Sequence, residues 1–247
     1  MVNLRRLMGM MVDVVLPPRC LGCGIIVRRH GGYCPKCWGS LHWIHDPRCL
    51  LCGVPYPCDY GVSGCYRQMP QTCLGPLMAG RSVFVYNKVS SQMILKLKYS
   101  DKTFMVETFG DHLMEALKTF NRTFTLLIPV PLHWRRQWIR KYNQSSLLAN
   151  ALSRRCGVPV AHTVLRRVLP TQPLKGGSFH KRVTALQGAF ALSPKAKPIL
   201  AGQHVVLIDD VWTTGATLQS CAHVLLQGGA KSVSALTMAR VLPADLS

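Results

Sequence analysis

Two adjacent carboxylates, Asp209 and Asp210, stand in a chain of 247 residues that has only 10 acidic residues against 30 lysines and arginines. They follow the apolar run 205–208 and precede a hydroxyl-rich turn made of Thr213, Thr214, Gly215, Ala216 and Thr217. Backbone N–H groups and hydroxyls at a helix N-terminus suit a phosphate dianion, and carboxylates beside them accept hydrogen bonds from sugar hydroxyls or hold Mg²⁺. The pattern predicts a site for a ribose 5-phosphate. The alternative is an acid that only caps the following helix, but two acids and three hydroxyls coincide here.

Cysteines are concentrated near the N-terminus, where nine of the eleven precede residue 74. The first four form two Cys-x-x-Cys pairs that are separated by ten residues: Cys20, Cys23, Cys34 and Cys37. Four thiolates at this spacing suit tetrahedral Zn²⁺. Disulfides are the weaker alternative, because nothing in the sequence indicates an oxidising compartment.

A second pair, Cys49 and Cys52, begins a similar unit with an irregular end. Cys58, Cys65 and Cys73 have no two-residue spacing among them, so any two could complete a second site. We therefore carry two alternatives, a second zinc held by Cys49, Cys52, Cys58 and Cys65, and a degenerate ribbon held by packing. Since closed thiolate sites leave no open position on the metal, the predicted role of zinc is structural, and its binding would fold this small module.

Aromatic and basic side chains alternate in the segment 133–143. Rings that stack on unpaired bases and cations that follow a phosphate backbone suit single-stranded nucleic acid, and the net charge of +20 favours a polyanionic partner. The alternative is a helix with inward-packed rings and a solvated basic face. The candidate nucleic-acid residues are Trp134, Arg135, Arg136, Trp138, Arg140 and Lys141.

Strands and helices alternate from residue 80 onward. We expect strands at 81–86, 125–130, 163–168, 204–208 and 232–239, and helices at 90–99, 103–120, 145–156 and 215–227. This order predicts an α/β domain with a mainly parallel sheet, in which ligands bind beyond the carboxyl ends of the strands. The clustering of cysteines predicts two units, an N-terminal helix with the zinc ribbon in 1–78 and the α/β domain in 79–247.

The first sixteen residues resemble a secretory signal only weakly. Asp13 interrupts their apolar run, and Pro17 and Pro18 follow where a small-residue cleavage site is expected. Helical spacing of the apolar residues predicts a short amphipathic helix instead. No run approaches the eighteen or so apolar residues that a membrane span requires. We therefore expect a cytoplasmic protein without a membrane span.

Taken together, these residues resemble the ComF family of competence-associated proteins, which join an N-terminal double zinc ribbon to a type I phosphoribosyltransferase-like domain. The stretch 205–217 looks like the phosphoribosyl diphosphate motif of those transferases, an apolar strand followed by two acids and Thr-Thr-Gly-x-Thr. Other shared features are Leu97-Lys98-Tyr99, the pair Thr171-Gln172, and the segments 128–132, 140–144 and 182–190. Two positions depart from the family: Lys141-Tyr142 replaces the usual Gly-Phe, and Val62 replaces the first cysteine of the last knuckle.

The resemblance implies that Asp209 and Asp210 are catalytic acids that contact the ribose hydroxyls, and that the turn 213–217 binds the 5-phosphate. It places the diphosphate at a loop containing Val130, Pro131 and Leu132, with Mg²⁺ as the accompanying ion. In the implied reaction, an acceptor displaces diphosphate at the anomeric carbon. No segment of the sequence identifies that acceptor.

The resemblance also implies a part in DNA uptake during natural transformation, with single-stranded DNA and proteins of the uptake machinery as partners. Two alternatives stay open. One is a non-catalytic single-stranded DNA-binding factor whose nucleotide site senses a ligand, and the other is a nucleobase salvage transferase.

Overall fold

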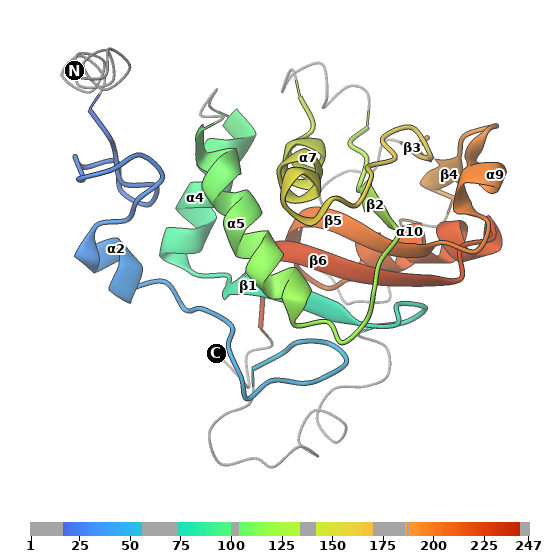
Figure 1. Cartoon of the computed structure of the whole chain (residues 1–247), viewed down its shortest axis with the longest axis horizontal. Helices are drawn as coiled ribbons and strands as arrows, with labels where there is room; N and C mark the ends of the chain where they lie inside the picture. The colour runs from blue at the N-terminus through green and yellow to red at the C-terminus, as the bar shows by residue number, and fades with distance from the viewer. Residues whose placement is uncertain are drawn as a thin grey trace, which may run out of the picture.

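A four-stranded parallel sheet forms the centre of the molecule (Figure 1). The computed structural model describes residues 17–55, 74–99, 104–133, 142–169, 186 and 188–242. The strands lie in the order β1 (Gly80–Val85), β6 (Ser232–Arg240), β5 (His204–Trp212) and β2 (Leu126–Pro129). Every neighbouring pair is parallel, which confirms the predicted α/β domain with a mainly parallel sheet.

Helices cover both faces of this sheet. α4 (Lys88–Tyr99), α5 (Phe104–Lys118) and α7 (Gln144–Cys156) lie on one face, and α10 (Ala216–Gln227) lies on the other (Figure 1). Successive side chains of a strand point to opposite faces, so Val206 and Ile208 pack into the first apolar cluster while Val205 and Leu207 pack into the second. A strand that is buried on both faces must be apolar almost throughout, and this explains the run that precedes the two acids.

A small hairpin lies outside the main sheet. β3 (Leu165–Arg167) pairs antiparallel with β4 (Phe190–Leu192), and α9 (Ala196–Leu200) follows. The predicted strand 163–168 is therefore present in shortened form, although it does not join the parallel sheet. The sequence patterns did not predict β4 and α9, which have 3 and 5 residues and are too short for a periodicity to develop.

The cysteine-rich segment is attached to the β1 edge of the sheet. Its short helix α2 (Pro35–Gly39) is followed by an extended stretch that runs antiparallel to β1. There the N–H of Ile44 donates to the carbonyl of Val83 at 2.9 Å, and the N–H of Val85 donates to the carbonyl of His42 at 2.8 Å. The guanidinium of Arg81 in β1 also donates to the carbonyl of Leu50 at 2.8 Å. Backbone bonds and this buried side chain therefore join the ribbon to the sheet.

Several sequence-based predictions lie outside the described residues. They are the helix in 1–16, the three cysteines Cys58, Cys65 and Cys73, and the basic aromatic segment from Trp134 to Lys141. The division of the chain at residue 78 stays a prediction. Within the ranges that the structure describes, no helix is long and apolar enough to cross a membrane.

Candidate ligand and metal sites

The two acids lie at the carboxyl edge of the sheet, but inside β5 and not after it. The predicted strand ended at Ile208, whereas β5 continues to Trp212, which pairs with Arg240 of β6. The strand continues because apolar side chains resume after the acids, with Val211 packed in one cluster and Trp212 only 1% exposed in the other. Asp209 and Asp210 are therefore fixed by sheet hydrogen bonding on a rigid element.

Asp210 is held by two side chains from different helices. It is 6% exposed, and its Oδ2 accepts hydrogen bonds from Lys98 Nζ at 2.9 Å and from Gln144 Nε2 at 3.0 Å. Lys98 comes from α4 and Gln144 is the first residue of α7. A buried carboxylate needs such partners, because its desolvation would otherwise be costly. Both contacts fall on Oδ2, so two donors from separate helices fix the orientation of this carboxylate.

Asp209 is held in a similar way by the start of α7. Its Oδ1 accepts from Ser145 Oγ at 3.0 Å and from the N–H of Asp210 at 2.9 Å. Burial, followed by the like charge of Asp210, raises the pKa of Asp209 to about 7, although these hydrogen bonds and the charge of Lys98 oppose the rise. Asp210 is thus paired with a lysine, whereas Asp209 is close to half-protonated at neutral pH.

The hydroxyl-rich turn leads from β5 into α10. Gly215 occupies the N-cap position with φ 82°, a left-handed conformation that favours glycine. Because Gly215 has no side chain, the N-cap residue makes no hydrogen bond to the first turn of α10. Thr213 is exposed, while Thr214 and Thr217 are half-buried. The helix begins at Ala216, one residue later than predicted, so Thr217 lies within it.

The predicted diphosphate loop lies beside the acids, at the end of the neighbouring strand β2. The N–H of Val130 already donates to the carbonyl of Ile208 at 2.9 Å, and its carbonyl accepts from Asn143 Nδ2 at 3.0 Å. Pro131 has no backbone N–H. Of the three residues predicted for this role, only Leu132 therefore retains a backbone N–H that could be offered to an anion.

Three side chains that contact the acids were not among the predicted site residues: Lys98, Gln144 and Ser145. Lys98 and Gln144 fall within segments that carry the family resemblance, and that signal could have identified them. Ser145 had no such signal. Its position depends on where α7 begins, and this is set by Asn143, whose side chain accepts from the N–H of Ser145 at the N-cap.

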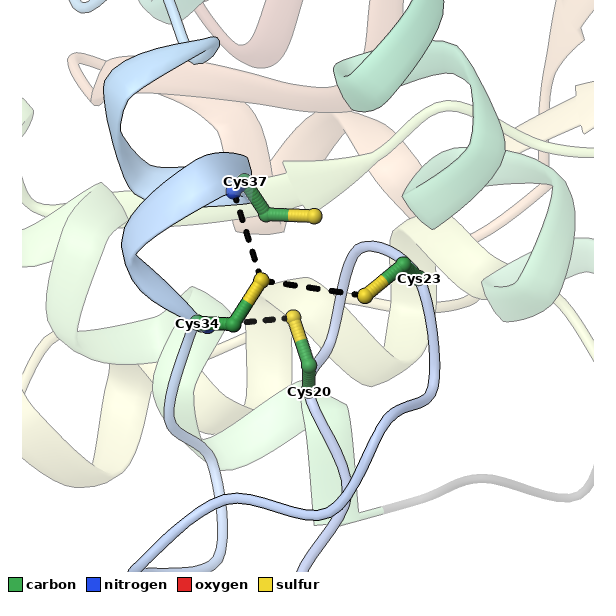
Figure 2. A group of neighbouring side chains, drawn as sticks. All are labelled: Cys20, Cys23, Cys34 and Cys37. Atoms are coloured by element: carbon green, nitrogen blue, oxygen red, sulfur yellow. Dashed lines mark hydrogen bonds between the residues drawn. The ribbon is translucent and has the colours of Figure 1, made fainter.

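The four N-terminal cysteines converge on one point, as their spacing predicts. Figure 2 shows Cys20 and Cys23 from one loop facing Cys34 and Cys37 at the start of α2. Their sulfur atoms all lie within 4.8 Å of one another, and Cys23 Sγ is 3.7 Å from Cys34 Sγ. A tetrahedral zinc with Zn–S bonds of about 2.3 Å separates its sulfur atoms by about 3.8 Å, so this donor set fits zinc.

The backbone around the cluster favours a thiolate at Cys20, whereas burial raises the pKa of Cys37 to about 12. The N–H of Cys34 donates to Cys20 Sγ at 3.2 Å, and the N–H of Cys37 donates to Cys34 Sγ at 3.4 Å. Burial alone would raise the pKa of the Cys20 thiol, but backbone N–H groups of Cys34, Cys23 and Gly22 outweigh it and lower that pKa to about 6. A thiol that ionises readily is a better metal ligand.

The second cysteine pair has the same turn as the first. The N–H of Cys20 donates to the carbonyl of Ile25 and that of Cys49 to the carbonyl of Val54, at 2.7 and 2.8 Å. Each turn closes on a left-handed glycine, Gly24 with φ 85° and Gly53 with φ 73°. Cys49 and Cys52 are both buried, while the predicted partners Cys58 and Cys65 lie outside the described residues.

Comparisons with known proteins agree with this architecture. The double zinc ribbon domain matches residues 11–74, and the phosphoribosyl transferase domain matches residues 143–242. The fold and these matches define the class of protein: a type I phosphoribosyltransferase fold with an N-terminal zinc ribbon.

Three relatives narrow the class to a family. Competence protein F of Haemophilus influenzae is 31% identical over 84% of this chain and 96% of its own length. DNA utilization protein YhgH of Escherichia coli strain K12 is 30% identical over 93% of this chain and 100% of its own. Competence protein ComFC of Bacillus subtilis strain 168 is 30% identical over 84% and 83%. The chain belongs to the ComF family of competence proteins, which confirms the resemblance found in the sequence.

Proposed function

We propose that this protein binds phosphoribosyl diphosphate together with Mg²⁺ at the carboxyl edge of its sheet. The observation that carries the proposal is the orientation of the two acids: Lys98, Gln144 and Ser145 hold one oxygen of each carboxylate. Ordered in this way, the carboxylates would accept hydrogen bonds from the two ribose hydroxyls or contact Mg²⁺ through its waters. The uncapped first turn of α10 lies next along the chain and would receive the 5-phosphate.

The diphosphate has fewer backbone donors than the sequence suggested. Because Val130 and Pro131 offer no N–H, we assign this group to Leu132, to the residues that follow it, and to Mg²⁺. The magnesium would neutralise part of the diphosphate charge when bound. Asp209 would have to lose its proton before it could contact a cation.

Calorimetric titration of the zinc-loaded chain tests this site. We expect saturable binding of phosphoribosyl diphosphate that requires Mg²⁺, and a loss of at least about tenfold in affinity when Asp209→Asn and Asp210→Asn are combined. Asp111→Asn on α5 is the matched control, because this exposed carboxylate pairs with Arg155 and contacts neither acid. Equal affinity in the double variant and the control would refute the assignment.

We further propose that the protein acts on single-stranded DNA during DNA uptake in the cytoplasm, in association with uptake proteins. The names of its relatives, competence protein and DNA utilization protein, support this role. The net charge of +20 also supports a polyanionic partner. The basic segment from Trp134 to Lys141 is connected at both ends to the candidate site, through His133 after β2 and through Tyr142, whose hydroxyl donates to the carbonyl of Leu97.

Salt dependence tests the DNA proposal. Affinity for single-stranded DNA should fall steeply as salt rises, and the slope should decrease when Arg135, Arg136 and Arg140 are replaced by alanine, because each phosphate contact contributes to it. An unchanged slope in the triple variant would contradict a role for this segment. Diphosphate release in the presence of candidate acceptors separates a transferase from a ligand sensor, and a screen with free nucleobases tests the salvage alternative.

A further inference from the structure

A cavity lies where the ribbon meets the β1 edge of the sheet, apart from the two acids. Its volume is about 430 Å³, which is within the range of small-molecule sites. Trp38, Trp43 and Arg48 line it from the ribbon, and His112 and Glu115 line it from α5. The cavity thus exists only where the ribbon is docked on the α/β domain.

Aromatic rings dominate one wall of this cavity. The ring of Trp43 lies 4.7 Å from that of Trp38 and 4.9 Å from that of His112, measured between centroids. Burial lowers the pKa of His112 to about 4, and its Nε2 is hydrogen-bonded to the hydroxyl of Tyr33 at 3.0 Å. The imidazole is therefore neutral and belongs to the aromatic wall. Trp38 is 53% exposed, a large apolar area on the surface of so charged a chain.

Trp43 also has a buried polar group that lacks a partner. Its Nε1 is inaccessible to solvent and has no hydrogen-bond acceptor in the part of the chain that the structure describes. Most buried donors in proteins are paired, and an unpaired one costs about 1–3 kcal/mol. Because water cannot reach this nitrogen, a ligand in the cavity cannot reach it either.

The polar rim of the cavity is electrically balanced. Asp46 pairs with Arg48 at 3.1 Å, and Glu115 pairs with Lys118 at 2.6 Å. These pairs leave carboxylate oxygens that can accept further hydrogen bonds, without a surplus of positive charge that would favour a phosphate. The cavity therefore suits a neutral planar ring with both acceptors and amino or imino donors.

We propose that this cavity binds a nucleobase, which stacks on the exposed ring of Trp38 beside the aromatic wall of Trp43 and His112. The base is that of a bound single strand, because the +20 charge of the chain attracts the phosphates while the cavity receives the ring. In this form the inference rests on the proposed binding of single-stranded DNA. It adds a base-contacting site on the ribbon that is independent of the segment 134–141. A free nucleoside has the same ring chemistry and is the other source to be tested.

The experiment measures binding to the zinc-loaded full chain by fluorescence anisotropy and calorimetry. The probes are a short oligodeoxythymidylate, an abasic oligomer of the same length, and free thymidine. Trp38→Ala should weaken binding of the oligodeoxythymidylate roughly 5- to 100-fold, since stacking contributes about 1–3 kcal/mol per base. Trp43→Phe keeps a ring on the wall and removes only the solvent-inaccessible donor, so it is the matched control and should bind with about native affinity. Neither change should affect the abasic oligomer.

The outcomes separate this inference from the proposed function. If both variants bind every probe with native affinity, the inference is wrong. If binding is lost only in a third variant, Trp134→Ala, the inference is also wrong, but the proposed binding of single strands by segment 134–141 stands. If the native protein binds none of the three probes, both the inference and the proposed binding of single-stranded DNA are wrong. Thymidine binding that weakens in Trp38→Ala supports the site and assigns it to free nucleosides, whereas a loss confined to the oligonucleotide assigns it to a strand. Unchanged zinc content in each variant establishes that the ribbon is intact.

Discussion

The cysteine cluster and the acidic pair each bring together groups that repel one another when ionised, but different forces position them. Around the thiols, the buried cluster consists of Cys20, Cys34 and Cys37 themselves, with only a few partly buried neighbours. The acids, by contrast, lie within a strand that is packed on both faces by two large apolar clusters. One site therefore depends on its ion to hold the chain together, whereas the other is assembled before any ligand arrives.

This difference has an energetic consequence. Removing the ion from the cluster should release the two Cys-x-x-Cys turns, because few apolar side chains are buried directly around the thiols. Removing a group from the acidic site should instead cost the energy of one buried contact, since the sheet around it persists. Four experiments, in order of decreasing effect, test this contrast.

The largest effect should follow loss of the four-cysteine site. In Cys20→Ser with Cys23→Ser, we expect the zinc bound there to be lost, with a cost to ribbon folding on the order of 10 kcal/mol. Hydrogen exchange should then become fast in residues 17–44 and remain slow in β5 and β6. Cys156→Ser on α7 is a matched control that should change neither. Slow exchange throughout the ribbon of the double variant would show that packing alone holds the ribbon folded. The ribbon and the acidic site would then not differ in how they are held.

Breaking the buried ion pair at the acidic site should have the next largest effect. Asp210→Ala leaves Lys98 without its carboxylate, so we expect a decrease of about 3 kcal/mol in the free energy of unfolding. Combining Asp210→Leu with Lys98→Met should recover much of that stability without restoring ligand binding, because an apolar pair avoids the desolvation cost. Urea denaturation gives the stabilities. A double variant as unstable as Asp210→Ala would mean that shape, not charge, governs this position.

The same contrast explains what could be predicted from the sequence. Cysteine spacing and the apolar strand with its acids are local patterns, so the metal cluster and the position of Asp209 and Asp210 followed from them. The end of β5 did not, because local rules treat two acids as the end of a strand, whereas pairing with β6 continues to Trp212. Lys98 and Ser145 come from helices far away in the sequence, and only packing brings them to the acids. Sequence thus predicted the groups that bear the chemistry better than the side chains that orient them.

A smaller, pH-dependent effect should arise from Asp209. Its pKa of about 7 lies above the ordinary value of about 3.9 expected in the unfolded chain. Between these values the folded protein binds more protons than the unfolded chain, so the free energy of unfolding should fall as pH rises, by up to about 1.4 kcal/mol per pH unit. Asp209→Asn removes this titration. Its stability relative to the native protein, measured in urea on the zinc-loaded chain without Mg²⁺, should therefore increase from about pH 5 to pH 7, and a constant difference would contradict the raised pKa.

The smallest effect concerns a hydrogen bond just before α7. The hydroxyl of Tyr142 donates to the carbonyl of Leu97 at 2.8 Å. This bond links the start of α7, which supplies Gln144 to Asp210, to the end of α4, which supplies Lys98. Tyr142→Phe should cost about 1 kcal/mol of stability and weaken phosphoribosyl diphosphate binding modestly, while zinc content stays unchanged. If it altered zinc content as well, the ribbon and the acidic site would be coupled more closely than their separate packing implies.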